Sequence, residues 1–231
     1  NICYSGVADI FRLPKFSLSF FRTQIAEGSM LPSGKMPYEV FIPAYRDEIL
    51  SDTVMVYGNV DEVELILNGK TIRRQTADKG PDSDYIPVPN GGNGKNLHFP
   101  PFTFYGVPKE RGVLKAVGYH QGKKVAEYTV KTPGVPERLD ITYFESGKPA
   151  TKNDLLIVYV RMLDKQGVLC PVNGIPVELS VQGGEIVGPT SYPLEAGVAS
   201  FLVRTGEISK ININATGKGF STRKSLKVGK E

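Results

Sequence analysis

The stretch GVADIFRLPKFSLSFFRTQ, residues 6–24, differs in pattern from everything that follows it in the chain. Pro14 suits the first turn of a helix, because proline lacks the N–H that would be unpaired there and its φ is already helical. Phe16 and Phe20 lie four residues apart, and Phe21 continues the aromatic run on an adjoining face. The stretch therefore predicts a short helix that needs burial on more than one side.

Strand patterns follow this helix, and the clearest is VMVYGNVDEVELILNGK at residues 54–70. Its apolar residues alternate with polar ones, as in half-buried strands. Asn68-Gly69 predicts a type I′ hairpin turn, since both residues accept a positive φ, and Gln121-Gly122 joins two further strands. We expect strands at residues 38–42, 53–57, 63–67, 72–74, 99–104, 113–119, 124–131, 139–144, 155–163, 177–181, 198–203, 211–215 and 221–228.

The spacing of these strands favours two tandem β-sandwiches after one short N-terminal helix, because no helical period separates them. The predicted domains are residues 1–36, 37–134 and 135–231, with a Gly-, Pro- and Ser-rich linker at 29–37 and a second linker at 132–136. The predicted fold class is mainly β. Because the chain begins at Asn1 and not at Met, we expect it to be part of a longer polypeptide.

The charge pattern gives little support to nucleic-acid binding. The net charge is +4 over 231 residues, and the basic residues are scattered except near the end of the chain. The basic cluster there fits a solvated edge strand that carries lysines against aggregation, and no base-stacking motif accompanies it. Its members are Lys218, Arg223, Lys224, Lys227 and Lys230.

Cysteine and histidine usage predicts neither a disulfide framework nor a metal centre. Cys3 and Cys170 fall in different predicted domains, and we interpret both as unpaired thiols. His98 and His120 stand apart from other ligand-type residues, so each is interpreted as a surface or packed residue. We expect no cofactor, no metal and no membrane span.

Two motifs carry a resemblance to a known family. The segment Gly6–Lys15 with the aromatic helix after it resembles the segment that closes the catalytic barrel in glycoside hydrolase family 2. Val54–Lys70 is similar to a strand pair in the sandwich after that barrel, and Pro100–Phe104, Gly112–Tyr119 and Thr129–Gly134 extend the match. The family contains β-galactosidases, β-glucuronidases and β-mannosidases. The resemblance implies that residues 1–36 end the barrel and that both sandwiches are immunoglobulin-like.

The resemblance also implies that the catalytic groups lie elsewhere. Retaining glycosidases use two carboxylates about 5 Å apart, and in this family both are glutamates on barrel strands that would precede Asn1. Glu62 and Glu64 share one strand face and are interpreted as solvated, so we expect the chain alone to be inactive. Glucuronidases of the family carry Asn-x-Lys where this chain has Cys3-Tyr4-Ser5, which favours a neutral sugar such as a β-galactoside.

Three residues of the first loop are candidates for the rim of the active site. Tyr4, Ser5 and Asp9 follow the last barrel strand in the resemblance, and barrel active sites form at that face. One of them would then contact a sugar hydroxyl. The alternative interpretation is structural: Asp9 and Arg12 pair with each other or cap the following helix.

A second candidate region lies in the first sandwich. Residues 78–85 contain three aspartates, which form either a polar loop or, less in keeping with their spacing, a calcium site. Four rings are candidates for an aromatic sugar platform, and the alternative is that they pack in the core or between domains. They are Tyr85, His98, Phe102 and Tyr105.

Two functions from different classes follow. In the first, the chain is the C-terminal part of a bacterial glycosidase, and its sandwiches brace a barrel that packs on Phe16, Phe20 and Phe21. In the second, it is an adhesin-like or carbohydrate-binding pair of immunoglobulin-type domains. The aromatic helix favours the first. We expect a periplasmic or extracellular location from the resemblance, and we expect an isolated chain to bury its aromatic patch within itself or in a homo-oligomer.

Overall fold

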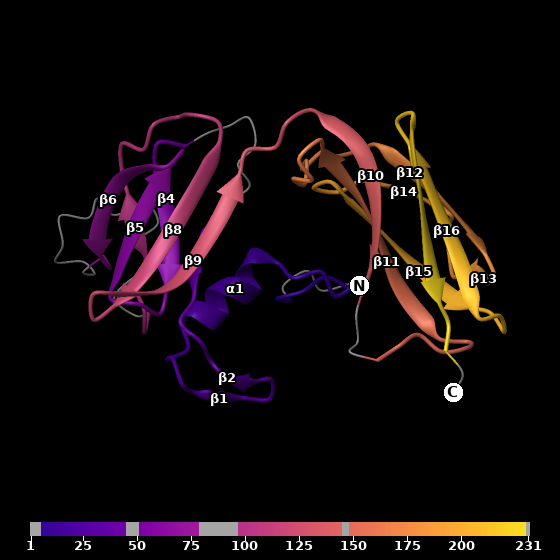
Figure 1. Ribbon diagram of the computed structural model, residues 1–231, viewed down its shortest axis with the longest axis horizontal. Coiled ribbons are helices and arrows are strands. Elements are labelled where there is room, and N and C mark those ends of the chain that lie inside the picture. The colour runs from indigo at the N-terminus through magenta and orange to yellow at the C-terminus, as the bar shows by residue number, and fades with distance from the viewer. Residues whose placement is uncertain (1–5, 45–50, 79–96, 145–147, 230–231) are drawn as a thin grey trace. The chain divides into compact units, whose positions relative to one another are not determined.

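The computed structural model describes residues 6–44, 51–78, 97–144 and 148–229. The chain divides into two compact units, which Figure 1 displays and which we describe separately. One unit contains Asn1–Asp9 and Leu13–Thr132, and the other contains Ile10–Arg12 and Pro133–Glu231. The prediction of a mainly β fold with one short helix is confirmed.

The first unit is a sandwich of two antiparallel sheets. Three strands pair in the order β3-β4-β7, and four strands pair in the order β6-β5-β8-β9. The strands are β3 (Val40–Phe41), β4 (Val54–Gly58), β5 (Glu62–Leu67), β6 (Lys70–Thr76), β7 (Phe102–Phe104), β8 (Val113–His120) and β9 (Lys123–Lys131). The expected hairpins are both present: Asn68 and Gly69 have φ of 50° and 82°, and Gln121 and Gly122 have φ of 48° and 76°.

The core of this sandwich comes from the strand alternation that the sequence shows. Val63, Leu65 and Leu67 of β5 are buried, and the residues between them face outward. Val54 and Val56 of β4 face them across the core. β7 lies at the edge of its sheet, and it follows Pro100 and Pro101, which have no N–H to donate to a neighbouring strand.

The helix α1 (Phe16–Thr23) is shorter than the sequence predicted. Lys15 is its N-cap, so Pro14 precedes the helix instead of occupying its first turn, and the prediction for Pro14 was wrong. Pro14 forms an isolated antiparallel bridge with Ala8, which holds it in extended backbone. The expected linker after the helix was also wrong in part, because β1 (Met30–Leu31) and β2 (Gly34–Lys35) pair as a small hairpin.

The second unit is also a sandwich, with sheet orders β10-β11-β15-β13 and β14-β12-β16-β17. The first order corresponds to the ABED sheet of an immunoglobulin fold, and β12-β16-β17 corresponds to its CFG sheet, with β14 added at the edge. Its strands are β10 (Pro136–Tyr143), β11 (Leu155–Asp164), β12 (Pro176–Gln182), β13 (Gly184–Ile186), β14 (Ser191–Pro193), β15 (Val198–Thr205), β16 (Lys210–Gly217) and β17 (Phe220–Lys227). The sequence reading missed β13 and β14.

Asp164 organises the entry to the second sandwich, and only 3% of it is exposed. Its Oδ1 accepts the backbone N–H groups of Gln166 (2.9 Å) and Val168 (2.8 Å), which closes the turn after β11. Its Oδ2 accepts the N–H of Gly134 at 2.7 Å. Burial acts to raise the pKa of Asp164, but the backbone donors outweigh it and the pKa is lowered.

One further sequence expectation is met in the part of the chain that the structure describes. The basic strand near the C-terminus is β17, which lies at a sheet edge as predicted. The Lys224 ammonium lies 5.6 Å from the centre of the Tyr143 ring.

Among the described helices, α1 is far too short to cross a bilayer, and none qualifies as a membrane span.

Candidate functional site

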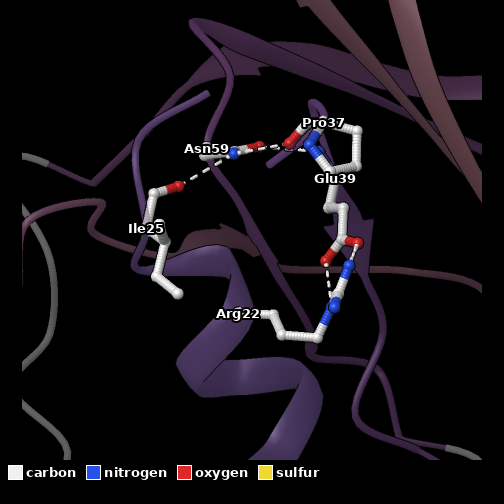
Figure 2. A network of polar contacts seen from close by, with 5 residues as sticks. All are labelled: Arg22, Ile25, Pro37, Glu39 and Asn59. Atoms are coloured by element: carbon white, nitrogen blue, oxygen red, sulfur yellow. Dashed lines mark hydrogen bonds and ion pairs between the residues drawn. The ribbon is translucent and has the colours of Figure 1, made fainter. Parts of the chain in front are cut away.

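A polar network joins α1 and the connector after it to the first sandwich (Figure 2). We call it the helix–sandwich joint and define it by Arg22, Ile25, Pro37, Glu39 and Asn59. Asn59 follows β4 and is 3% exposed, whereas asparagines in turns are usually solvated. A buried amide needs partners for its donors and its acceptor, so its contacts define the joint.

The Asn59 side chain is satisfied by backbone groups from the connector. Its Nδ2 donates to the carbonyl oxygens of Ile25 and Pro37, each at 3.0 Å. Its Oδ1 accepts the N–H of Glu39 at 2.6 Å, and its own N–H donates to the Glu39 carbonyl at 3.2 Å. One side chain therefore fixes the path of the chain from the end of α1 to the start of β3.

Arg22 and Glu39 add an ion pair to the joint. Arg22 Nε donates to both carboxylate oxygens of Glu39 at 3.1 Å, and the terminal Nη2 also contacts Oε1. Hydrogen bonding to Glu39 is the main reason that the pKa of Arg22 is raised, and partial burial opposes it. The fork geometry orients the last turn of α1 toward the sandwich.

Close packing explains the glycine before Asn59. A Cβ on Gly58 would lie 2.9 Å from the Glu39 carbonyl oxygen and 2.9 Å from Val40 Cγ1. Gly118 is equally confined, because its Cβ would lie 2.7 Å from the same Val40 methyl. The Val-Tyr-Gly-Asn sequence at residues 56–59 is therefore the structural basis of the joint.

The aromatic face of α1 divides between the sandwich and the outside. Phe20 packs edge-on against Tyr57 with ring centres 5.0 Å apart, and Phe16 does the same with Phe41 at 5.6 Å. Phe21 contacts Phe20 but remains 55% exposed, and Phe16 is 36% exposed. The first sandwich thus covers one side of the helix and leaves aromatic surface on the rest.

The loop before α1 closes on itself. The Asp9 N–H donates to the Leu13 carbonyl at 3.0 Å, and Asp9 Oδ1 accepts the Leu13 N–H at 2.8 Å. Lys15 N–H donates to Val7 at 3.0 Å, and Arg12 has a φ of 63° at the tip. The idea that Asp9 caps the helix was wrong, because its carboxylate closes this loop instead. Its possible contact with sugar stays a prediction, and Tyr4 and Ser5 lie outside the described residues.

The four-ring sugar platform was wrong, because Phe102 is fully buried in the sandwich core. His98 packs edge-on against Phe99 at 4.5 Å, and Tyr105 is 42% exposed. Tyr85 lies outside the described residues. The alternative interpretation, core packing, is correct for Phe102.

The acidic face of β5 is a closed polar network. Glu64 accepts hydrogen bonds from the hydroxyls of Thr71 and Tyr119, each at 2.7 Å, and Glu62 accepts one from Arg74 at 2.5 Å. The bond from Thr71, followed by that from Tyr119, lowers the pKa of Glu64. A general acid in glycoside hydrolysis needs a raised pKa, so Glu64 is poorly suited to that role.

Within the described ranges, His, Cys, Asp and Glu side chains form no group able to hold a metal ion. Asp78 instead holds β7: its Oδ2 accepts the Thr103 hydroxyl at 2.6 Å, and burial raises the pKa of Asp78. Asp82 and Asp84 lie outside the described residues, as does Cys3.

Cys170 is a buried free thiol. His120 is not isolated, because its Nδ1 lies 3.1 Å from Asp61 and its ring stacks on Tyr38.

Comparisons with known proteins agree with these features. A family model described as a domain of unknown function, DUF4982, matches residues 51–126, which include the Val-Tyr-Gly-Asn sequence. The chain is 32% identical over 217 residues to a β-galactosidase of Thermoanaerobacter pseudethanolicus, covering 89% of this chain and 27% of that protein. It is 30% identical over 129 residues to a β-galactosidase of Rhizobium radiobacter, covering 55% of this chain and 92% of that sequence.

The fold is shared with solved enzymes. A β-glucuronidase from glycoside hydrolase family 2 superposes with a TM-score of 0.77 at 22% identity, covering 98% of this chain and 23% of that one. The chain spans about a fifth to a quarter of the length of most of the curated relatives it matches. Sequence, fold and the motif around Asn59 lead to the same conclusion: the chain belongs to glycoside hydrolase family 2.

Proposed function

We propose that this chain is the non-catalytic C-terminal part of a retaining, β-galactosidase-like glycosidase that acts on β-linked carbohydrates. Its role is to brace the catalytic barrel and the rim of the active site. The observation that carries the proposal is the helix–sandwich joint, which fixes α1 to the first sandwich through Asn59 and the Arg22–Glu39 pair. A helix fixed in this way is a rigid contact element for a neighbouring domain.

The exposed side of α1 supports a barrel as its partner. Phe16 and Phe21 keep 36% and 55% of their surface exposed although their neighbours pack on the sandwich. Large exposed aromatics beside a rigid joint are typical of an interface. The matched β-galactosidase from Thermoanaerobacter pseudethanolicus is nearly four times the length of the matched region, which leaves room for a barrel of about 250 residues.

The test uses the complete enzyme that contains this chain. Phe21→Ser removes exposed aromatic surface, so it should lower the melting temperature and the activity on nitrophenyl β-galactoside of the complete enzyme. The same substitution should leave the stability of the isolated chain nearly unchanged. Val187→Ser, at a residue of the second unit that is 36% exposed, is the matched control and should change neither quantity. Equal effects of the two substitutions would refute the barrel contact.

Inactivity of the isolated chain is part of the proposal. The acidic side chains of β5 are committed to Thr71, Tyr119 and Arg74, which supports a structural role for them. The isolated chain should release no nitrophenol from β-galactoside or β-glucuronide substrates. Measurable turnover that survives repurification would overturn this part.

We further propose a neutral sugar substrate, because Cys3-Tyr4-Ser5 provides no cation for a uronate carboxylate. The complete enzyme should then hydrolyse a β-galactoside faster than a β-glucuronide. The reverse order would exclude the proposal.

We also propose a periplasmic or extracellular location, which cell fractionation with an antibody to this chain would test.

The alternative function is a non-enzymatic carbohydrate-binding or adhesin-like module. Its support is the pair of immunoglobulin-like sandwiches, a fold that many unrelated binding proteins share. The coding region upstream of Asn1 separates the two. Strand–helix alternation with two glutamates at strand ends supports the glycosidase, and further sandwich repeats support the binding module.

A further inference from the structure

Tyr159 of β11 is buried on the face of the strand that points away from the core. Alternate residues from Leu156 to Met162 belong to the hydrophobic core, so the strand geometry places Tyr159 on the opposite face. Its partners on the neighbouring strands are Thr142 and Ser200, which are too short to cover a phenol ring. Tyr159 is nevertheless only 7% exposed, so a segment from outside the sheet lies over it.

The tip of the loop before α1, residues 10–12, contacts Tyr159 and belongs to the same unit. The Tyr159 hydroxyl donates to the Phe11 carbonyl oxygen at 2.6 Å. The Arg12 guanidinium carbon lies 5.1 Å from the centre of the Phe144 ring, close enough for a cation–π interaction. Two successive residues of the loop tip are therefore held by the second sandwich.

The backbone at the loop tip is strained. Arg12 has a φ of 63°, a conformation that residues with a Cβ rarely adopt. Such backbone persists only where surrounding contacts hold it, and it is frequent at functional sites. The Tyr159 hydroxyl and the Phe144 ring supply contacts of this kind to Arg12 and to the residue before it.

The loop is stiff enough to pass this constraint on to Asp9. The Asp9 N–H donates to the Leu13 carbonyl, and the Leu13 N–H donates to the Asp9 carboxylate. The Lys15 N–H donates to the Val7 carbonyl and closes the base of the loop. Asp9 lies two residues before Phe11, a stretch that spans at most about 7 Å. A fixed tip therefore limits where the Asp9 carboxylate can lie.

We propose that Tyr159 is a positioning residue for the rim of the active site. Together with Phe144 it holds the tip of the loop, and it thereby sets the place of Asp9 against the substrate. The inference rests on the proposed function, which puts this loop at the rim of a glycosidase active site. It extends that function, because it gives the second sandwich a part in substrate binding. Tyr159 acts through the loop and not by contact with the sugar.

The first experiment measures hydrogen exchange of the full chain by mass spectrometry. Tyr159→Phe removes only the hydroxyl, so exchange at the amides of Asp9, Leu13 and Lys15 should become about fivefold faster. Tyr192→Phe is the matched control, because Tyr192 lies in β14 of the other sheet of the same sandwich. The control should leave exchange of the loop as in the parent. Equal exchange of the loop in the parent and in Tyr159→Phe would overturn the proposal.

The second experiment measures kcat and KM of the complete enzyme on the nitrophenyl β-glycoside that it hydrolyses fastest. Tyr159→Phe should raise KM about threefold with kcat nearly unchanged, because a displaced Asp9 binds the sugar less well in the ground state and the transition state alike. A merely structural role would lower the melting temperature and leave KM as in the parent. Unchanged KM in an active enzyme would overturn this inference alone, and an enzyme that hydrolyses no β-glycoside would overturn the proposed function with it.

A double-mutant cycle tests whether Tyr159 acts through Asp9. In an Asp9→Ala background the contact with the sugar is already lost, so Tyr159→Phe should change KM by less than about twofold. Tyr192→Phe should leave KM unchanged in both backgrounds. Full additivity of the effects of Tyr159→Phe and Asp9→Ala on KM would overturn the positioning role.

Discussion

The side-chain amide of Asn59 uses its NH₂ group and its oxygen in hydrogen bonds to the main chain. Its amide is nearly buried and bonds the carbonyls of Ile25 and Pro37 and the N–H of Glu39. Replacing it with alanine would leave these three backbone groups without their partner in a dry site. Unsatisfied buried groups cost about 1–3 kcal/mol each, and relaxation recovers part of this.

We therefore expect Asn59→Ala to lower the free energy of unfolding of the first unit by about 3 kcal/mol. Urea denaturation of the isolated chain measures this change. Asn212→Ala is the control, because the Asn212 side chain accepts an exposed hydrogen bond from Ser225 at 2.6 Å. Its effect should stay within about 0.5 kcal/mol. A loss at Asn59 no larger than this would show that water replaces the amide.

Asp164 makes the second unit sensitive to acid. Its pKa in the folded chain lies below the ordinary value of 3.8, because backbone donors outweigh the effect of burial. A carboxyl with a lowered folded pKa stabilises the fold above its unfolded pKa, and this stabilisation is lost as the pH falls through the folded pKa. The loss should begin below about pH 4.

Asp164→Asn should therefore cost about 2 kcal/mol at pH 7, and less as the pH falls toward 2. The asparagine keeps one acceptor for the turn but places an NH₂ group opposite the Gly134 N–H. Because an amide does not titrate, the variant lacks the pH-dependent contribution of Asp164 to the free energy of unfolding. Urea denaturation of both proteins at several pH values measures the gap. A gap that stays constant from pH 7 to pH 2 would contradict the lowered pKa.

At the scale of the elements, Gly112 fixes how β8 begins beside the Asn68 turn. Gly112 has a φ of 135°, and a Cβ there would lie 1.9 Å from Asn68 Oδ1. That oxygen accepts the Val113 N–H at 2.9 Å, so moving the amide breaks a bond between the turn and β8. Both backbone strain and collision therefore oppose a side chain at this position.

Gly112→Ala should cost about 3 kcal/mol, whereas Gly122→Ala should cost about 1 kcal/mol. Gly122 has a φ of 76° and open space around its Cβ position, so it isolates the conformational cost. Thermal unfolding of the two variants compares them directly. Equal costs would mean that the Asn68 amide moves aside freely.

The elements also show what the sequence could predict. Asn68-Gly69 and Gln121-Gly122 carry their own turn chemistry, so both hairpins were predicted correctly. β13 and β14 were missed because each has only three residues, and glycine or proline stands within it. The β1–β2 hairpin was missed for a related reason, since its Gly- and Ser-rich sequence is also typical of a linker.

The helix–sandwich joint was harder to predict than the hairpins. An asparagine after a strand is typical of a solvated turn, and the partners of Asn59 lie 22 and 34 residues away. One signal was available in the sequence: Asn59 stands between Gly58 and Val60, inside the apolar pattern that runs from Val54 to Leu67. The same difficulty affected Phe102, where a nearby His98 and Tyr105 suggested an exposed aromatic group although β7 faces the core.

At the scale of the whole molecule, each unit has its own hydrophobic core. Phe102 belongs to the first core and Phe201 to the second, and both are nearly inaccessible to solvent. Units with separate cores can unfold separately. The sequence-based domain limits at residues 36 and 134 stay predictions about the longer polypeptide.

Phe102→Ala should destabilise the first unit by about 4 kcal/mol and leave the second unchanged, and Phe201→Ala should do the opposite. Hydrogen exchange followed by mass spectrometry separates the two. Phe102→Ala should speed exchange in β5 and β8 but not in β11 and β16. Faster exchange in both units of both variants would indicate a single cooperative unit.

The partners of Asn59 have a consequence for how this region can evolve. All three are main-chain groups, so the amide recognises the route of the connector and not the identity of its side chains. Substitutions at exposed positions between Ile25 and Pro37 can accumulate as long as the route is kept, whereas Met36 is buried and Gly28 and Gly34 have a positive φ. A sequence from a distant relative, of equal length, could therefore be spliced in between these two residues, whereas position 59 itself has almost no freedom to drift.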